Sequence, residues 1–216
     1  MTRPAAIVIA KAPRPGFCKT RLEPLLGAEG CARLQAALVA RAAAWAASVG
    51  DPYVVFTPED AREEMEALAP GATLIPQVGG SLGDRLAGAF RAVLAEHPGP
   101  ALLVGVDTPQ LRPAHAEAAL DDLRDGIDVT VGPASDGGYY LIGLREPNDA
   151  VFALPDELWG GAEVFGRTLE AATRAGLTVG MLRPERDLDE EHDARAFLAD
   201  PLTPPEIRAA LERPAS

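Results

Sequence analysis

The chain has 216 residues, 47% of them hydrophobic and 24% charged, which suits a globular protein with room for one α/β domain. Its formal net charge of -12 excludes a binder of nucleic acid or of anionic membranes, since both partners require a basic surface. Cys18 and Cys31 fit neither a disulfide framework nor a metal-ligand spacing, and no apolar run suits a signal sequence or a membrane span. We therefore expect a cytoplasmic protein.

Strand and helix signals alternate along the chain. Short β-branched apolar runs predict strands, and longer amphipathic runs predict helices. In chain order we expect a strand at 5–10, a helix at 28–48, a strand at 52–57, a helix at 61–69, a strand at 73–77, a helix at 81–97, a strand at 101–107, a helix at 113–124, strands at 128–134 and 139–144, a helix at 162–176, a strand at 177–182 and a last helix after the acidic segment 186–194. The alternation predicts one doubly wound α/β domain over residues 1–216, with 101–107 as a central strand and 201–216 as a peripheral tail.

A cluster of cations follows the first predicted strand, at the edge where open α/β sheets bind their ligands. The loop carries Lys11, Arg14, Lys19 and Arg21, and Gly16 permits close approach of a ligand to the backbone. A polyphosphate is the ligand that suits these cations in a protein of net charge -12. We expect all five residues to bind nucleotide phosphates; the alternative is a solvated basic loop.

Carboxylates follow the central strand and the last strand. Asp107 stands where the apolar run ends, a usual place for a metal-binding Asp, and the alternative is a cap of the next helix. Asp187 and Asp189 point the same way in an extended segment, so one of them can complete the site; the alternative is an acidic surface turn. Mg²⁺ (or Mn²⁺) takes one or two carboxylates together with substrate phosphates and water. The pattern therefore predicts a divalent metal at Asp107 and one of the later carboxylates.

Three further loops carry weaker signals. The first, residues 77–85, leaves a strand and opens a helix, so its backbone N–H groups can meet a base or a phosphate. The second is the turn between the strands at 128–134 and 139–144, and the third surrounds Trp159; hairpin chemistry and core packing are the alternatives. Nucleotide contacts are expected from Gln77, Gly79, Gly80 and Arg85, and acceptor contacts from Asp136, Gly137, Gly138, Tyr139 and Trp159.

Four segments together resemble a known family. AKAPRPGFCKTRL, GVDTPQL, GPASDGGYYLIGL and DLDEEHDARAF match, in order, the motifs of a family of GT-A-fold transferases. That family is labelled as associated with radical-SAM or selenodomain proteins, or as an arsenosugar-biosynthesis glycosyltransferase, and the resemblance spans residues 4–198. It implies a single Rossmann-like GT-A domain of the nucleotide-diphospho-sugar transferase type, with a mixed, mostly parallel central sheet and helices on both faces.

A more distant resemblance concerns nucleotidyl transfer. The spacing from Lys11 to the KTRL segment, the GG-x-L loop and the strand ending in G-x-D-x-P are similar to phospholactate and phosphoenolpyruvate guanylyltransferases and, more loosely, to molybdenum-cofactor nucleotidyltransferases. This resemblance implies that Lys11, Lys19 and Arg21 hold the triphosphate and that Asp107 and Asp189 hold the metal. Two features depart from it: the signature G-x-G-x-R is absent, and DGGYYLIG is a motif of the first family alone.

The expected activity is that of a metal-dependent, nucleotide-using transferase. A nucleotidyltransferase would condense an NTP with a phosphorylated or acidic acceptor and release pyrophosphate, with Lys19, Arg21 and Asp107 as catalytic residues. The alternatives are a GT-A glycosyltransferase with an NDP-sugar donor, although one carboxylate stands where D-x-D is usual, and a non-catalytic nucleotide-binding module. The expected partners are a nucleotide and a small-molecule acceptor, without nucleic acid or membrane, and the expected assembly is a monomer or homodimer.

Overall fold

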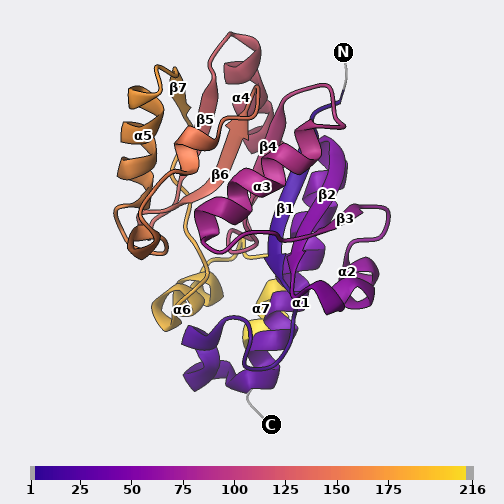
Figure 1. Ribbon diagram of the computed structural model, residues 1–216. Helices are drawn as coiled ribbons and strands as arrows, with labels where there is room; N and C mark the ends of the chain where they lie inside the picture. Colours follow the sequence, from indigo (N-terminus) through magenta and orange to yellow (C-terminus); the bar gives the residue numbers. More distant parts are fainter. Residues whose placement is uncertain (1–2, 213–216) are drawn as a thin grey trace.

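The computed structural model describes residues 3–212, and a seven-stranded sheet runs through its centre (Figure 1). The strand order is β3-β2-β1-β4-β6-β5-β7. Strand β6 is antiparallel to its neighbours β4 and β5, and the other neighbouring strands are parallel. The strands are β1 (Ala5–Lys11), β2 (Asp51–Thr57), β3 (Thr73–Pro76), β4 (Ala101–Val104), β5 (Val129–Pro133), β6 (Tyr139–Leu144) and β7 (Val179–Met181). The sheet is thus mixed and mostly parallel, as predicted.

Helices cover both faces of the sheet. The buried side chains of α1, α2, α4, α6 and α7 pack on one face, and those of α3 and α5 pack on the other. Successive side chains of β1 point to the two faces in turn: Val8 belongs to the hydrophobic cluster under α1, and Ile7 belongs to the cluster under α3. The helices are α1 (Glu23–Val49), α2 (Arg62–Leu68), α3 (Leu82–Leu94), α4 (Pro113–Arg124), α5 (Val164–Arg174), α6 (Glu191–Ala199) and α7 (Pro205–Glu212). The predicted α/β fold class is confirmed.

The middle of the sheet is β4, which is buried along its whole length. Its position, fourth among seven strands, confirms the predicted central strand. The strand ends at Val104, earlier than predicted, because Gly105 leaves the ladder of hydrogen bonds. Asp107 consequently stands in a loop at the carboxyl edge of the sheet.

Helices α2, α3 and α5 are a few residues shorter than predicted, α6 begins inside the acidic segment, and two further differences concern α1 and α7. Helix α1 begins at Glu23, and a break at Gly27, with φ of 66°, separates its first residues from the body predicted from residue 28. Helix α7 lies within the segment 201–216 predicted as a peripheral tail, of which 213–216 are outside the described residues, and it runs beside α1 (Figure 1). Its Ile207 is fully buried in the core that α1 lines. None of the helices in residues 3–212 has both the length and the apolar character that a membrane crossing needs.

Candidate functional site

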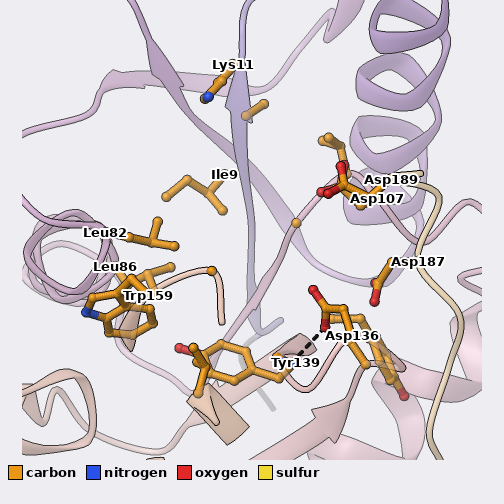
Figure 2. Close-up of a pocket in the computed structure, with 18 of the residues that line it drawn as sticks. Ile9, Lys11, Leu82, Leu86, Asp107, Asp136, Tyr139, Trp159, Asp187 and Asp189 are labelled. Atoms are coloured by element: carbon orange, nitrogen blue, oxygen red, sulfur yellow. Dashed lines mark hydrogen bonds between the residues drawn. The ribbon is translucent and has the colours of Figure 1, made fainter. Parts of the chain in front are cut away.

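A cavity of about 740 Å³ opens at the carboxyl ends of β1 and β4 (Figure 2). Its walls come from the loops that follow β1, β3, β4, β5 and β7 and from residues 156–161, which precede α5. Loops at one edge of an open α/β sheet meet above it, so side chains distant in sequence line the same space. The predicted site residues in this lining are Lys11, Lys19, Arg21, Gln77, Gly80, Arg85, Asp107, Asp136, Gly138, Tyr139, Trp159 and Asp189.

Lys19 is buried at the charged end of the cavity. Its ammonium nitrogen lies 2.6 Å from Asp107 Oδ1 and 3.5 Å from Asp189 Oδ1, and it also donates to the carbonyl of Leu188. Within residues 3–212, Lys19 is the one residue other than glycine with a positive φ, 52°, and the Cys31 thiol donates to its carbonyl at 3.2 Å. Burial opposes the charged form, but Asp107 and Asp189 outweigh it and raise the pKa of Lys19. The cavity therefore contains a fixed ammonium group.

Asp107 and Asp189 form one carboxylate pair around this ammonium. Their contacts of 2.6 Å and 3.5 Å with the same nitrogen place the two oxygens no more than the sum, 6.1 Å, apart. The backbones are joined as well, because the N–H of Leu188 donates to the carbonyl of Asp107 at 2.7 Å. Arg21 reaches the second oxygen of Asp189 at 2.8 Å. The structure thus brings together the two carboxylates that the resemblance implies as metal ligands.

Asp187 lies beside this pair in a more buried position. Its Oδ1 accepts a hydrogen bond from the Thr108 hydroxyl at 3.2 Å, while its Oδ2 is buried without a partner among residues 3–212. Figure 2 shows its carboxyl group turned toward Asp136. Burial first, and then the charges of Asp136 and Asp107, raise the pKa of Asp187 to about 7. The acidic wall of the cavity thus holds more carboxylate than the ammonium of Lys19 neutralises.

The donor atoms of Asp107 and Asp189 suit a hard divalent cation such as Mg²⁺ or Mn²⁺. Both side chains are carboxylates, and both already face one cation. Within residues 3–212, no group of three or more His, Cys, Asp or Glu residues is arranged to hold a metal by itself. The pair therefore fits an ion that takes two carboxylates and completes its shell with phosphate and water.

The loop after β3 borders the cavity on the side of β1. The side-chain amide of Gln77 donates to the carbonyls of Ala10 and Val55 at 3.0 and 3.1 Å, so it ties β3 to the ends of β1 and β2. Arg85, one turn into α3, donates to the carbonyl of Ser81 at 3.1 Å. Lys11 stands at the end of β1 on the same side (Figure 2). This side of the cavity is therefore cationic.

Three residues predicted to bind the nucleotide lie outside the cavity lining. Arg14 forms ion pairs with Asp60 at 3.0 Å and Glu64 at 2.6 Å, and these carboxylates hold its guanidinium beside α2. Gly16 has φ of 73° and Gly79 has φ of 125°, conformations that L side chains rarely adopt. A side chain at Gly79 would also collide with the first turn of α3. These residues shape or neutralise the loops around the cavity.

Another part of the lining carries carboxylates and aromatic rings. The predicted acceptor residues in this part are Asp136, Gly138, Tyr139 and Trp159. Gly137 is not in the lining; it has φ of 92°, and a β-carbon there would overlap the carbonyl oxygen of Ala162. The turn between β5 and β6 therefore packs directly on the loop that carries Trp159.

Sequence reasoning missed part of the lining. Asp156 was missed, and its place close to Trp159 was a signal that could have found it, whereas the glycines at 160 and 161 belong to the segment that the sequence did single out. Ile9, Leu82 and Leu86 form an apolar wall beside it (Figure 2). An amphipathic pattern shows that such side chains face inward, but it does not show which of them border a cavity.

The fold recurs in other solved structures. A provisionally assigned nucleotide-diphospho-sugar transferase from Desulfovibrio desulfuricans G20 has a TM-score of 0.87 and 30% identity, covering 98% of this chain and 94% of that one. A CMP:2-keto-3-deoxy-manno-octonic acid synthetase complexed with CTP has a TM-score of 0.55 and 17% identity, covering 92% and 99%. Rv0371c from Mycobacterium tuberculosis H37Rv, in complex with manganese, has a TM-score of 0.53 and 19% identity, covering 90% and 98%. The last two likenesses show the fold alone.

Family membership follows from the sequence match. No curated protein matches the chain significantly. A bacterial family described as uncharacterized protein conserved in bacteria (DUF2064) matches residues 35–156, more than half of the chain. The likeness to nucleotide-diphospho-sugar transferases is supported by the Desulfovibrio desulfuricans structure, while the association with radical-SAM proteins stays a prediction. By this match the chain belongs to the DUF2064 family.

Proposed function

We propose that this protein is a metal-dependent nucleotidyltransferase, in which an acceptor oxygen attacks the α-phosphate of an NTP and pyrophosphate leaves. The observation that carries the proposal is that one cavity is lined both by cations, Lys11, Lys19, Arg21 and Arg85, and by the carboxylate pair of Asp107 and Asp189. A triphosphate needs several cations along its length, and a transferring phosphoryl group needs a second reactant held in line with it. One cavity that is lined by both cations and carboxylates provides for both.

Proteins of the same fold support the nucleotide side. One structure in this group is complexed with CTP, another is an inositol-1-phosphate CTP transferase from T. maritima, and a third is a 4-diphosphocytidyl-2C-methyl-D-erythritol synthase. Rv0371c was solved with manganese. Their identities to this chain are between 11% and 19%, so they supply only a precedent for nucleotide and metal on this fold. Whether this chain uses a nucleotide depends on the residues of its cavity.

The side chains would act through position and charge. Lys11, Lys19 and Arg21 would neutralise the β- and γ-phosphates, which depart as pyrophosphate. Asp107 and Asp189 would hold Mg²⁺ or Mn²⁺, which when bound neutralises charge on the phosphates. One bond forms between the acceptor oxygen and the α-phosphorus, the bond from the α-phosphorus to the bridging oxygen of pyrophosphate breaks, and the proton of an acceptor hydroxyl passes to water or to the departing pyrophosphate. No nucleophilic side chain is required.

The carboxylates of the lining favour a hydroxyl compound as the acceptor. Asp136, Asp156 and Asp187 also line the cavity, and two of the lining cations, Lys19 and Arg21, are already paired with Asp107 and Asp189. Carboxylates accept hydrogen bonds from hydroxyl groups and repel phosphate. The sequence led us to expect a phosphorylated or acidic acceptor, whereas this lining favours an uncharged polyhydroxyl compound.

Glycosyl transfer from an NDP-sugar is the second candidate. The Desulfovibrio desulfuricans protein, 30% identical to this chain, carries the name of a nucleotide-diphospho-sugar transferase and favours it. The same cations would then hold the departing nucleoside diphosphate. The single carboxylate in the segment Val106-Asp107-Thr108, where such enzymes usually have D-x-D, favours nucleotidyl transfer.

A product assay separates the two candidates. The protein is incubated with each common NTP, Mg²⁺ or Mn²⁺, and matched pairs of sugars and sugar phosphates, and pyrophosphate is measured. Parallel reactions with UDP- and GDP-sugars measure the released nucleoside diphosphate. Pyrophosphate release that is stimulated by the unphosphorylated sugars supports the proposal, and Asp107→Asn should lower it by about 100-fold or more. Nucleoside diphosphate without pyrophosphate would replace the proposal with glycosyl transfer, and neither product would contradict both.

A further inference from the structure

The place where a divalent ion would join Asp107 to Asp189 is held by the chain's own ammonium group. Lys19 Nζ contacts one oxygen of each carboxylate, at 2.6 Å from Asp107 and 3.5 Å from Asp189, and it also donates to the carbonyl of Leu188. The side chain of Lys19 is 3% exposed, so these three oxygens, and not water, surround its charge. A metal ion that bridged the two carboxylates would have to share them with this ammonium or displace it.

The backbone conformation of Lys19 is fixed next to Asp107 and Asp189. Its φ of 52° and ψ of 34° lie in the left-handed region, which a lysine adopts at a cost in energy. Hydrogen bonds fix this conformation: the N–H of Leu22 donates to the Lys19 carbonyl at 2.8 Å, and the Cys31 thiol donates to it at 3.2 Å. The lysine can therefore change its side-chain partner while its backbone stays in place.

Charge decides which cation the pair accepts. Asp107 and Asp189 carry two negative charges, Lys19 supplies one positive charge, and Arg21 adds a second at Asp189 Oδ2, 2.8 Å away. A divalent ion added to this arrangement meets carboxylates that are already paired with cations, so they attract it less than a free pair would. Phosphate oxygens that enter the cavity offer Lys19 and Arg21 a new partner and release the carboxylates.

We propose that Lys19 is an internal cation that closes the Asp107–Asp189 pair to divalent metal until nucleotide phosphates draw its ammonium away. This inference rests on the proposed function, because it requires that nucleotide and metal share this cavity. Metal and nucleotide then bind together, each strengthening the other, since a coupling between two ligands is reciprocal. The free protein keeps a neutralised pair and takes up metal as part of the nucleotide complex.

The test measures metal binding rather than turnover. Mn²⁺ is titrated into the wild type, and the free ion is followed by electron paramagnetic resonance, with and without the α,β-methylene analogue of each common NTP; the Mn²⁺ that each analogue chelates by itself is measured without protein and subtracted. We expect Mn²⁺ alone to bind at least about tenfold more weakly than with the analogue that binds, which lies within the usual range of couplings. Equal affinity in the two titrations would overturn the proposal, and this arm requires no variant.

Lys19→Met removes the ammonium and keeps the length of the side chain. We expect this variant to bind Mn²⁺ alone at least about tenfold more tightly than the wild type. Lys11→Met is the matched control: it removes the same charge from the same cavity, but Lys11 has no ion pair with Asp107 or Asp189 in the described residues, so the affinity should change by less than about twofold. Unchanged or weaker Mn²⁺ binding in Lys19→Met, or an equal gain in Lys11→Met, would overturn the proposal.

Two further outcomes distinguish a failure of the proposed function from a failure of the role proposed for Lys19. If no nucleotide analogue binds, the proposed function fails, while the comparison of Mn²⁺ binding between wild type and Lys19→Met still decides whether the ammonium excludes metal. Lys19→Gln, compared with Lys19→Met by circular dichroism and Mn²⁺ titration, distinguishes loss of charge from misfolding. Two folded variants that both leave Mn²⁺ binding unchanged would remove Lys19 from this role.

Discussion

Burial and two neighbouring carboxylates make the ionisation of Asp187 costly in the folded protein. The ordinary pKa of 3.8 is raised to about 7 by desolvation first and by Asp136 and Asp107 next. The folded state therefore holds this proton more tightly than the unfolded state does. The stability that the protonated group contributes is complete below about pH 4 and is lost as the pH rises through about 7.

Asp187→Asn should stabilise the protein at pH 8 by on the order of 1–3 kcal/mol, because the amide has no charge to bury. The gain should shrink at pH 5, where Asp187 of the wild type is protonated in the folded state. Urea unfolding at both pH values measures the difference. Glu29→Gln, which neutralises an exposed carboxylate of α1, should change the free energy of unfolding by less than about 0.5 kcal/mol. An equal gain at pH 5 and pH 8 would contradict the assignment to ionisation.

Among the structural elements, the turn between β5 and β6 supports the loop that carries Trp159. The N–H of Gly137 donates to the carbonyl of Ala134 at 3.2 Å, and the carbonyl of Gly137 accepts from the N–H of Phe165 at 2.9 Å. No room is left for a side chain at Gly137, because the carbonyl of Ala162 occupies that space. The glycines of this segment are therefore explained by the contact between two loops as well as by the turn itself.

Gly137→Ala should destabilise the protein more than Gly160→Ala does. Gly160 also has a positive φ, 83°, but a β-carbon there would meet no atom within 4 Å, so its substitution should cost only the backbone strain, about 1 kcal/mol. Gly137→Ala adds the collision with Ala162 and should cost roughly 2–4 kcal/mol. It should also raise the KM for the acceptor, since the loop with Trp159 must move. Urea unfolding of both variants tests the order, and equal costs would contradict the close contact of the loops.

The helices and strands, and the approach of Asp107 to Asp189, could be predicted from the sequence. The apolar run that ends before Asp107 identified the central strand, because only a strand buried on both faces is apolar throughout. Asp107, Asp189 and Lys19 then converge because the loops at the carboxyl edge of a sheet meet there, whichever side chains they carry. The position of Asp107 in a loop beyond the strand was missed, since Gly105 fits a strand and a loop equally well in sequence.

Contacts between distant segments were the unpredictable part. Arg14 looks like a phosphate ligand in sequence, but its partners Asp60 and Glu64 belong to the next βα unit, and only the packed structure brings them to it. The burial of Asp187 depends in the same way on Thr108 and on the turn at Asp136. Local patterns identify elements and their ends, whereas ion pairs and pKa shifts depend on tertiary distances that no single segment contains.

On the scale of the whole molecule, the last described helix, α7, packs into the same hydrophobic core as the first helix, α1. Ile207 of α7 is fully buried in the same cluster as Trp45 of α1, and Arg41 of α1 pairs with Glu206 at 2.8 Å. Trp159 lies on the other face of the sheet, where it packs against the hydrophobic cluster that includes α3 and lines the cavity. Because β1 contributes side chains to both clusters, we propose that residues 3–212 unfold as one cooperative domain.

The two tryptophans of the chain test this proposal, because each reports on one face of the sheet. In Trp45→Phe the fluorescence comes from Trp159 alone, and in Trp159→Phe it comes from Trp45 alone. Ile207→Ala, placed in both backgrounds, should lower the free energy of unfolding by roughly 2–4 kcal/mol, the usual cost of emptying a fully buried site. The shift in the urea midpoint should be the same for both probes, although Ile207 lies on the face of Trp45 only. Leu202→Ala, at a neighbouring residue that is 75% exposed, should leave both midpoints nearly unchanged. A midpoint that moves for Trp45 while it stays in place for Trp159 would mean that α7 unfolds apart from the cavity, and the C-terminal segment would then be peripheral after all.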